Sequence, residues 1–228
     1  MGAWTLDDIP WHRFQRDKLD PEIVRVVKAA SLVEQNGAAY AHHLCRVFAD
    51  DPEFQAIARR WGAEETQHGQ ALARCVVEIG TSSYYTALRE AAAEPVLQEI
   101  CRHIAADELR HYRLFYKNLD RYLAREPIGR LGRLRVALGR VAESEDDELA
   151  YAYYAANEPE RAYDRRHYTR AYARRAYALY RPHHIERGVA MLLKAIGLTP
   201  NGRLSRVASR LAWHAMRYRA ARLAKMAA

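Results

Sequence analysis

Glycine and proline are scarce in this chain. Eleven glycines and eight prolines among 228 residues are too few for the many turns of an all-β protein. Ala, Leu, Arg and Glu are frequent instead, and half of the residues are hydrophobic. A chain of this length can bury a substantial core. The composition therefore predicts an all-α protein.

Cysteine is scarcer still. The three cysteines, Cys45, Cys75 and Cys101, are odd in number and form no Cys-x-x-Cys pair. This pattern favours small buried thiols in a reducing compartment over a framework of disulfide bonds.

Targeting, membrane-spanning and dinucleotide-binding signals are also missing from the sequence. Asp7 and Asp8 oppose the basic start of a signal peptide, and Leu6 occupies the position where a myristoylation motif needs Ser or Thr. The best apolar run, residues 188–198, contains Lys194 and is too short to cross a bilayer. No flavin or nicotinamide fingerprint is found. We therefore expect a cytoplasmic protein without a flavin or nicotinamide site of its own.

Acidic residues are lacking from residues 199–228, which carry seven of the basic residues that give the chain its net charge of +8. An apolar stripe also follows this segment at helical spacing: Leu204, Val207, Leu211, Ala215 and Tyr218. The pattern predicts a basic helix whose partner is an acidic carrier protein or an anionic membrane surface. A plain solvated helix that caps the core is the alternative. Nucleic acid is disfavoured, because no binding motif accompanies the charge.

One motif occurs twice. Glu65-x-x-His68 is followed 43 positions later by Glu108-x-x-His111. Residues three apart share one side of a helix, so each Glu and its His should point in the same direction. Each motif continues an apolar stripe at helical spacing; the stripe residues are Phe54, Ile57, Ala58, Trp61 and Leu72, and Leu97, Ile100, Cys101, Ile104 and Phe115. The motifs should therefore face a buried region.

A buried carboxylate beside a buried imidazole costs free energy unless a partner compensates it. Two such pairs on facing helices can supply four ligands to a shared metal site, and one more Glu from each of two further helices completes a dinuclear carboxylate centre. Glu34 and Glu78 are the candidates for these two positions, since each precedes a Glu-x-x-His motif by about 30 residues. Glu34 by itself favours a position at the edge of its stripe, where it reaches solvent; both motifs together favour a ligand.

Helix-start signals divide the chain. Asp20-Pro21, Asp51-Pro52 and Pro182 each predict the beginning of a helix, and Pro95 predicts the beginning of a helix or a kink in one. The first helix should bury a stripe from Ile23 to Phe48. A further helix is expected over residues 130–157, then a segment rich in Tyr and Arg over 163–180, a helix from Pro182 through Ile196, and the basic helix. We expect a helical bundle in residues 1–127 and a helical extension in 128–228.

These motifs resemble those of the ferritin-like di-iron carboxylate superfamily. The stretches at residues 60–65 and 104–112 look like those of bacterial ferritin-like proteins related to acyl-carrier-protein desaturases and rubrerythrins, and the resemblance covers residues 4–125. It implies a four-helix bundle that binds two iron ions, or iron and manganese. The ligands it implies are Glu34, Glu65, His68, Glu78, Glu108 and His111. Glu64 and Asp107 would accept hydrogen bonds from the imidazole rings and fix their tautomers.

The sequence departs from that family in one respect. A ferritin-like bundle crosses its own length between the second and third helices, but only nine residues separate His68 from Glu78. On one continuous helix, Glu78 would lie about 20 Å beyond Glu65 and on nearly the opposite side. Either the crossover is deleted, so that the site is lost or assembled between chains, or a segment has been left out of the sequence.

Three functions are compatible with these patterns. The resemblance implies a homo-oligomeric di-iron oxidoreductase that activates O₂, takes electrons from an external donor and acts on an acyl or other apolar substrate. The second function is that of a ferroxidase or iron-storage protein, which predicts a symmetric cage and no electron donor. The third is that of a metal-free helical scaffold, in which the acids and histidines form buried hydrogen-bond networks. The long C-terminal extension favours the first function over the second.

Overall fold

The computed structural model describes residues 4–75, 82–125, 128–143, 147–200 and 202–225, and every regular element in these ranges is helical. Three short 3-10 helices, Leu6–Asp8, Trp11–Arg13 and Arg16–Lys18, come first. The α-helices are α1 (Pro21–Gln35), α2 (Gly37–Val47), α3 (Pro52–Cys75), α4 (Ser82–Ala91), α5 (Pro95–Arg125), α6 (Arg130–Glu143), α7 (Asp147–Asn157), α8 (Arg165–Leu179), α9 (Pro182–Ala195) and α10 (Arg203–Lys225). The expected all-α class is confirmed.

Acidic side chains cap the helices where the sequence predicts that they begin. The side chain of Asp20 accepts a hydrogen bond from the Glu22 N–H at 2.8 Å, and Asp51 accepts one from the Phe54 N–H at 2.9 Å. Glu94 is fully buried and caps α5 by accepting the Leu97 N–H at 2.6 Å. Each bond satisfies a backbone donor that the first turn of a helix leaves without an intrahelical partner.

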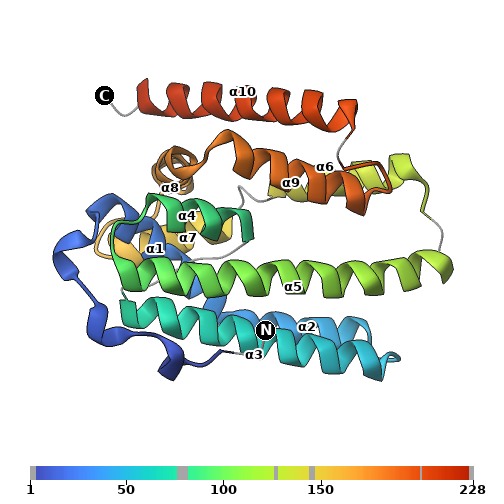
Figure 1. Ribbon diagram of the computed structural model, residues 1–228, viewed down its shortest axis with the longest axis horizontal. Helices are drawn as coiled ribbons and strands as arrows, with labels where there is room; N and C mark the ends of the chain where they lie inside the picture. The colour runs from blue at the N-terminus through green and yellow to red at the C-terminus, as the bar shows by residue number, and fades with distance from the viewer. Residues whose placement is uncertain (1–3, 76–81, 126–127, 144–146, 201, 226–228) are drawn as a thin grey trace.

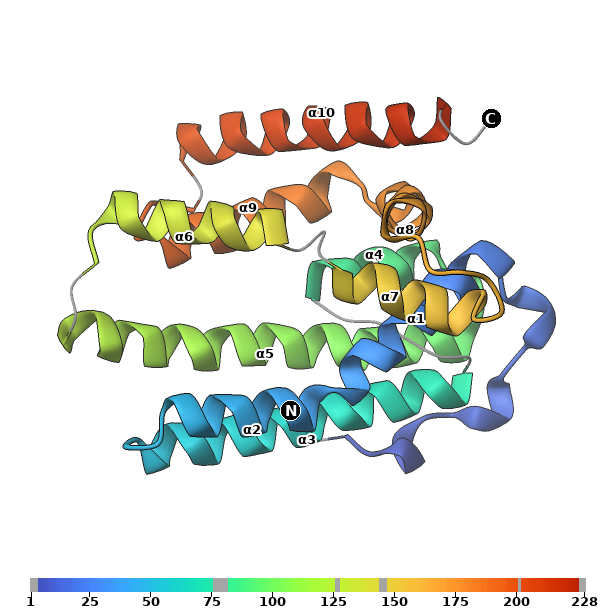
Figure 2. The same cartoon turned by 180° about the vertical axis from the view of Figure 1, so that it is seen from behind.

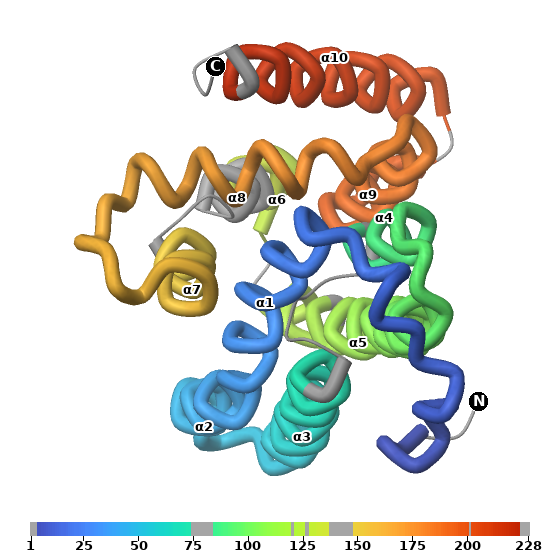
Figure 3. The backbone as a smooth tube through the Cα atoms, turned by 90° about the vertical axis from the view of Figure 1, so that its left-hand side faces the viewer, coloured from blue at the N-terminus to red at the C-terminus, as the bar shows by residue number. Residues whose placement is uncertain are grey.

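The helices α3 and α5 lie side by side in opposite directions (Figure 1). The helices α1 and α2 pack against α3, and α4 packs against α5. Seen along their axes, α2, α3 and α5 lie around one end of α1 (Figure 3). Only residues 92–94 join α4 to α5, so these two neighbours are antiparallel, and α4 therefore runs in the same direction as α3.

The first helix differs from the expectation of one continuous element. Asn36 separates α1 from α2, and the chain changes direction there (Figure 2). Just beyond the bend, α2 lies against α3 at backbone contact: a Cβ added to Gly37 would lie 2.4 Å from the Cβ of Glu65, and one added to Gly62 would lie 2.5 Å from the Cβ of Ala41. The bend lets α2 follow α3, and the two glycines permit the close approach.

We expect Gly62→Ala to destabilise the protein by about 1–3 kcal/mol, because the new methyl group must push α2 away from α3. Thermal unfolding followed by circular dichroism measures this change. Gly188→Ala is the matched control: an added Cβ there meets nothing within 4 Å, so the same substitution inside α9 should be neutral or stabilising. Equal melting temperatures for the two variants would show that the contact between the helices is not tight.

The extension after residue 128 packs onto the bundle. Ala150, Tyr153 and Tyr168 belong to the same hydrophobic core as Val26 and Leu88, so residues on both sides of the expected boundary share one core. The helix expected over residues 130–157 is found as α6 and α7, on either side of residues that lie outside the described ranges. The expected start of α9 at Pro182 is confirmed.

The outermost helix, α10, exposes most of its apolar stripe. Leu204, Val207 and Leu211 are all more than half exposed, whereas Ser205 and Ser209 are buried. The reason is that α10 packs against α8 and α9 through the side of the helix on which Ser205 and Ser209 lie. Among the described residues, no helix is long and apolar enough to cross a membrane.

Candidate metal centre

Five of the six predicted ligands come together between α1, α3 and α5 of a single chain. One oxygen or nitrogen from each of Glu34, Glu65, His68 and Glu108 can be chosen so that all four lie within 4.8 Å of one another. The fifth, His111, places its Nδ1 3.0 Å from Glu65 Oε1 and 3.6 Å from Glu108 Oε1. The sixth predicted ligand, Glu78, and the question of the missing crossover fall within residues 76–81, outside the described residues.

Each histidine contacts an acid of the opposite helix through its Nε2 atom. His68 Nε2 lies 3.1 Å from Asp107 Oδ2, and His111 Nε2 lies 2.7 Å from Glu64 Oε2. These are the two acids that the resemblance assigns to this role. Since a carboxylate can only accept, Nε2 carries a proton in both rings, and the lone pair of the neutral ring is on Nδ1. Both Nδ1 atoms are directed at the buried carboxylates.

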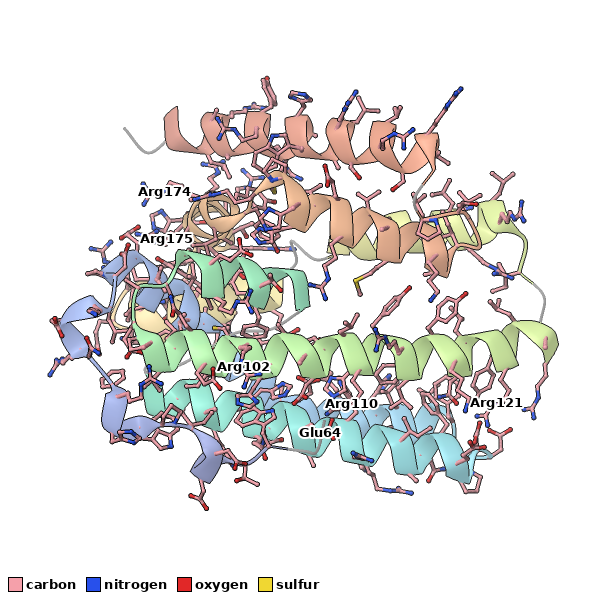
Figure 4. All side chains as sticks on the ribbon, viewed as in Figure 1. Glu64, Arg102, Arg110, Arg121, Arg174 and Arg175 are labelled. Carbon is pink, nitrogen blue, oxygen red and sulfur yellow. The ribbon has the colours of Figure 1, made fainter. Side chains whose placement is uncertain are left out.

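Arg110 joins the two outer acids. Its guanidinium donates to Glu64 Oε2 at 2.7 Å and to Asp107 Oδ1, and Figure 4 shows Arg110 and Glu64 meeting between α3 and α5. Burial alone would raise the pKa of Glu64, but hydrogen bonds with His111 and Arg110 outweigh it and lower the pKa to about 2. The pKa of Asp107 is likewise raised by burial and lowered, to about 2, mainly by its bond with His68. Both outer acids are therefore carboxylates at neutral pH.

Ionisation is unfavourable for the inner carboxyl groups, those of Glu34, Glu65 and Glu108. Burial raises the pKa of Glu34 well above its ordinary value and raises that of Glu108 as well. Burial opposes ionisation of Glu65 too, but its contacts with His111 and His68 lower the pKa of that carboxyl. For His111, burial would lower the pKa, and the carboxylates of Glu108 and Glu64 raise it to about 11. Three buried acids thus require positive charge beside them, which either protons or a metal ion can supply.

Two buried polar atoms at the centre have no hydrogen-bond partner among the described residues. They are Glu34 Oε2 and His111 Nδ1. The other oxygen of Glu34 accepts a hydrogen bond from the Tyr85 hydroxyl at 2.9 Å, while Oε2 lies 3.3 Å from His68 Nδ1 without hydrogen-bond geometry. A buried polar atom without a partner costs about 1–3 kcal/mol. A cation between these atoms would satisfy both, so the residues fit a metal site.

Three residues of the site carry no role in the sequence analysis. Trp4 donates its indole N–H to Asp107 Oδ2 at 2.7 Å, and its ring stacks with the His68 ring at 6.0 Å between centroids. Tyr85 reaches Glu34 from α4. The spacing of the Glu-x-x-His motifs does not predict a role for Trp4 or Tyr85, because each belongs to a part of the chain that carries neither motif. Arg110 could have been found, since it stands three positions after Asp107 on the same side of α5.

A second group of metal-ligating residue types lies where α4 meets the start of α9. His183 Nε2 and His184 Nε2 lie 3.1 and 3.2 Å from Glu90 Oε2. However, His184 Nδ1 accepts the Arg181 backbone N–H at 3.0 Å, so the neutral ring carries its proton on Nε2. That proton occupies the nitrogen whose lone pair a metal would need, and Nε2 lies near Glu90 without hydrogen-bond geometry. We interpret this group as a network that fixes the beginning of α9.

An open cleft of about 740 Å³ meets the centre from the side of α5. Glu108 and His111 form part of its wall, and the remaining lining, from α2, α3, α5 and α9, is almost entirely apolar or aromatic. The lining includes Phe54, Trp61, Phe115, Gly188 and Met191. Among the inner ligands, Glu108 is the one whose side chain is most exposed, at 16 %. The cleft therefore gives a path to the centre that ends at Glu108.

Comparison with known proteins adds no relative: no protein family, curated protein or solved structure matches this chain. The functional assignment therefore depends on the chemistry of the site.

Proposed function

We propose that this chain is a ferritin-like di-iron oxidoreductase that activates O₂ and acts on an apolar substrate. One observation carries the proposal: two imidazoles, each held through Nε2 by an outer acid, direct their Nδ1 atoms at three buried carboxylates, and two polar atoms at that point have no other partner. The direction of α4, which runs with α3 as the third helix of such a bundle runs with the second, also supports it.

The ligand set suits iron. Glu34, Glu65 and Glu108 provide hard anionic oxygens that stabilise higher oxidation states, and one neutral imidazole for each metal limits the total charge. Two iron ions, or iron and manganese, would supply the electrons that reduce O₂ and the oxidising power directed at the substrate. The protein's own residues hold this arrangement: Asp107 and Glu64 fix the imidazole rings, and Tyr85 fixes Glu34.

The cleft favours an oxidoreductase over an iron-storage protein. A hydrated ferrous ion would pass the side chains of Phe54, Trp61 and Phe115, none of which can replace its water, and the cleft lining offers few other polar groups. An acyl chain or another apolar molecule would instead bury its surface there and exclude water from the centre. The metal-free scaffold is disfavoured because two buried atoms, Glu34 Oε2 and His111 Nδ1, lie without hydrogen-bond partners at the point where the carboxylates and imidazoles meet.

A substitution at Gly188 tests the role of the cleft. A Cβ at this position meets nothing within 4 Å, and the residue lines the cleft, so Gly188→Phe should fill the cleft without disturbing the helix. We expect unchanged iron content and at least a tenfold loss of substrate-dependent O₂ consumption. The assay supplies ferrous iron, a chemical reductant and a panel of fatty acids, with oxidised products identified by mass spectrometry. Gly188→Ala is the control and should behave as the unsubstituted protein.

Two outcomes would contradict the proposal. If iron is oxidised and retained with no effect of any apolar compound on O₂ consumption, the protein is a ferroxidase or storage protein. If Gly188→Phe leaves substrate oxidation intact, the substrate reaches the centre by another route.

A further inference from the structure

The outer side of α10 carries an apolar stripe in an unusual place. Leu204, Val207, Leu211 and Tyr218 are 56, 54, 66 and 69 % exposed. Their separations of three, four and seven residues place them along one side of the helix. The stripe is about 20 Å long at 1.5 Å per residue. Large apolar side chains exposed in a continuous row mark a surface that meets another apolar phase.

The opposite side of α10 already has its partner. Ser205 and Ser209 are buried, and each lies about 200° around the helix from Val207 and Leu211 respectively. Through this side α10 packs against α8 and α9, and it forms the outermost layer of the molecule (Figure 1). The exposed stripe is therefore not needed to hold α10 on the protein.

Arginines flank the stripe. Arg203, Arg206, Arg210 and Arg217 are exposed and lie along one edge of it. Residues 199–228 contain seven Arg and Lys residues and no acid. Arg206 and Arg210 share a small groove with Glu186 of α9, the only acid that lines it in the described part of the chain. The outer side of α10 is thus both apolar and strongly positive.

We propose that the outer side of α10 docks on an anionic membrane surface, with the apolar stripe inserted among the acyl chains and the arginines at the lipid headgroups. A helix with an apolar side beside a basic side is the arrangement that lies in a bilayer interface. Anionic lipids supply the negative charge that residues 199–228 lack. The helix lies on the bilayer and does not cross it, in agreement with the hydropathy of the described helices.

The positive charge of α10 argues against a second copy of this chain as the partner that covers the stripe. Two α10 helices facing each other would bring seven positive charges against seven with no acid between them in residues 199–228. An acidic protein would satisfy the arginines, but the row of leucine, valine and tyrosine requires apolar surface along its whole length. A bilayer provides both properties without a matching shape.

Vesicle sedimentation with the full chain tests this proposal. We expect binding to vesicles of phosphatidylcholine with 30 % phosphatidylglycerol, and at least tenfold weaker binding to pure phosphatidylcholine or in 0.5 M NaCl, since salt screens the arginines. The double variant Leu204→Gln, Leu211→Gln should lose at least tenfold in affinity. Its control is Leu131→Gln, Val136→Gln on α6, where the side chains are 84 and 58 % exposed, and this variant should bind normally.

The other outcomes overturn the proposal. They are absence of vesicle binding, equal binding to neutral vesicles, or full binding by the Leu204 and Leu211 variant. Self-association that this variant abolishes, measured by analytical ultracentrifugation, would assign the stripe to a second copy. Stripe-dependent binding to poly-L-glutamate without vesicle binding would assign it to an acidic protein. The inference is independent of the metal centre, so Glu65→Gln should leave vesicle binding unchanged.

Discussion

Replacing Glu65 with glutamine is expected to abolish metal binding. Glu65 contacts both histidines at the centre, with Oε2 3.2 Å from His68 Nδ1 and Oε1 3.0 Å from His111 Nδ1. Glutamine keeps the shape but removes the charge and turns an N–H donor toward a nitrogen lone pair. We expect iron to fall from about two ions per chain to near zero, which corresponds to a loss of at least 100-fold in affinity. Elemental analysis after anaerobic loading and desalting measures this.

Glu99→Gln provides the matched control. Glu99 is also a glutamate of α5 beside a histidine, with its Oε1 3.3 Å from His103 Nε2 and 2.6 Å from Arg102. It lies outside the group of five ligands, so its substitution should leave the iron content unchanged. Full iron occupancy in Glu65→Gln would refute the ligand set, and equal losses in both variants would indicate a general effect on the fold.

Metal loading should raise the melting temperature by roughly 8–16 °C. A ligand that binds only the folded state at 1,000 times its dissociation constant stabilises it by about 4 kcal/mol, and each kcal/mol shifts the melting temperature of a chain this size by about 2–4 °C. The metal would also satisfy Glu34 Oε2 and His111 Nδ1, which otherwise have no partner among the described residues. Melting curves with ferrous or manganous ion, and then with a chelator, measure the shift and its reversal.

The same melting experiment on the Glu34→Gln variant distinguishes a metal centre from a structural network. Glutamine still accepts the Tyr85 hydrogen bond and cannot ionise in this buried position, so the metal-free variant should melt at or above the temperature of the unsubstituted chain. The shift on adding metal should shrink. If the acids and histidines instead form a structural network, breaking it should destabilise the metal-free protein by about 3–5 kcal/mol, and metal should have no effect on either protein.

Local patterns in the sequence predict much of the helical framework. The caps at Asp20 and Asp51 and the prolines at 95 and 182 mark helix starts that the structure confirms. The spacing of Glu65 and His68 indicates that both point inward, and both are buried. These predictions succeed because capping and helical periodicity depend on residues a few positions apart, so the sequence alone contains the information.

The sequence by itself determined that the chain is helical, where most helices begin, and which acids and histidines share a helix side. Tertiary structure decided the rest: the bend at Asn36, the contacts of Asp107 with His68 and Glu64 with His111 across two helices, and the approach of Tyr85 and Trp4. It also decided that α10 buries its serines and exposes its leucines. The reason is that periodicity shows which side of a helix is apolar, but which side finds a neighbour depends on where the other helices pack.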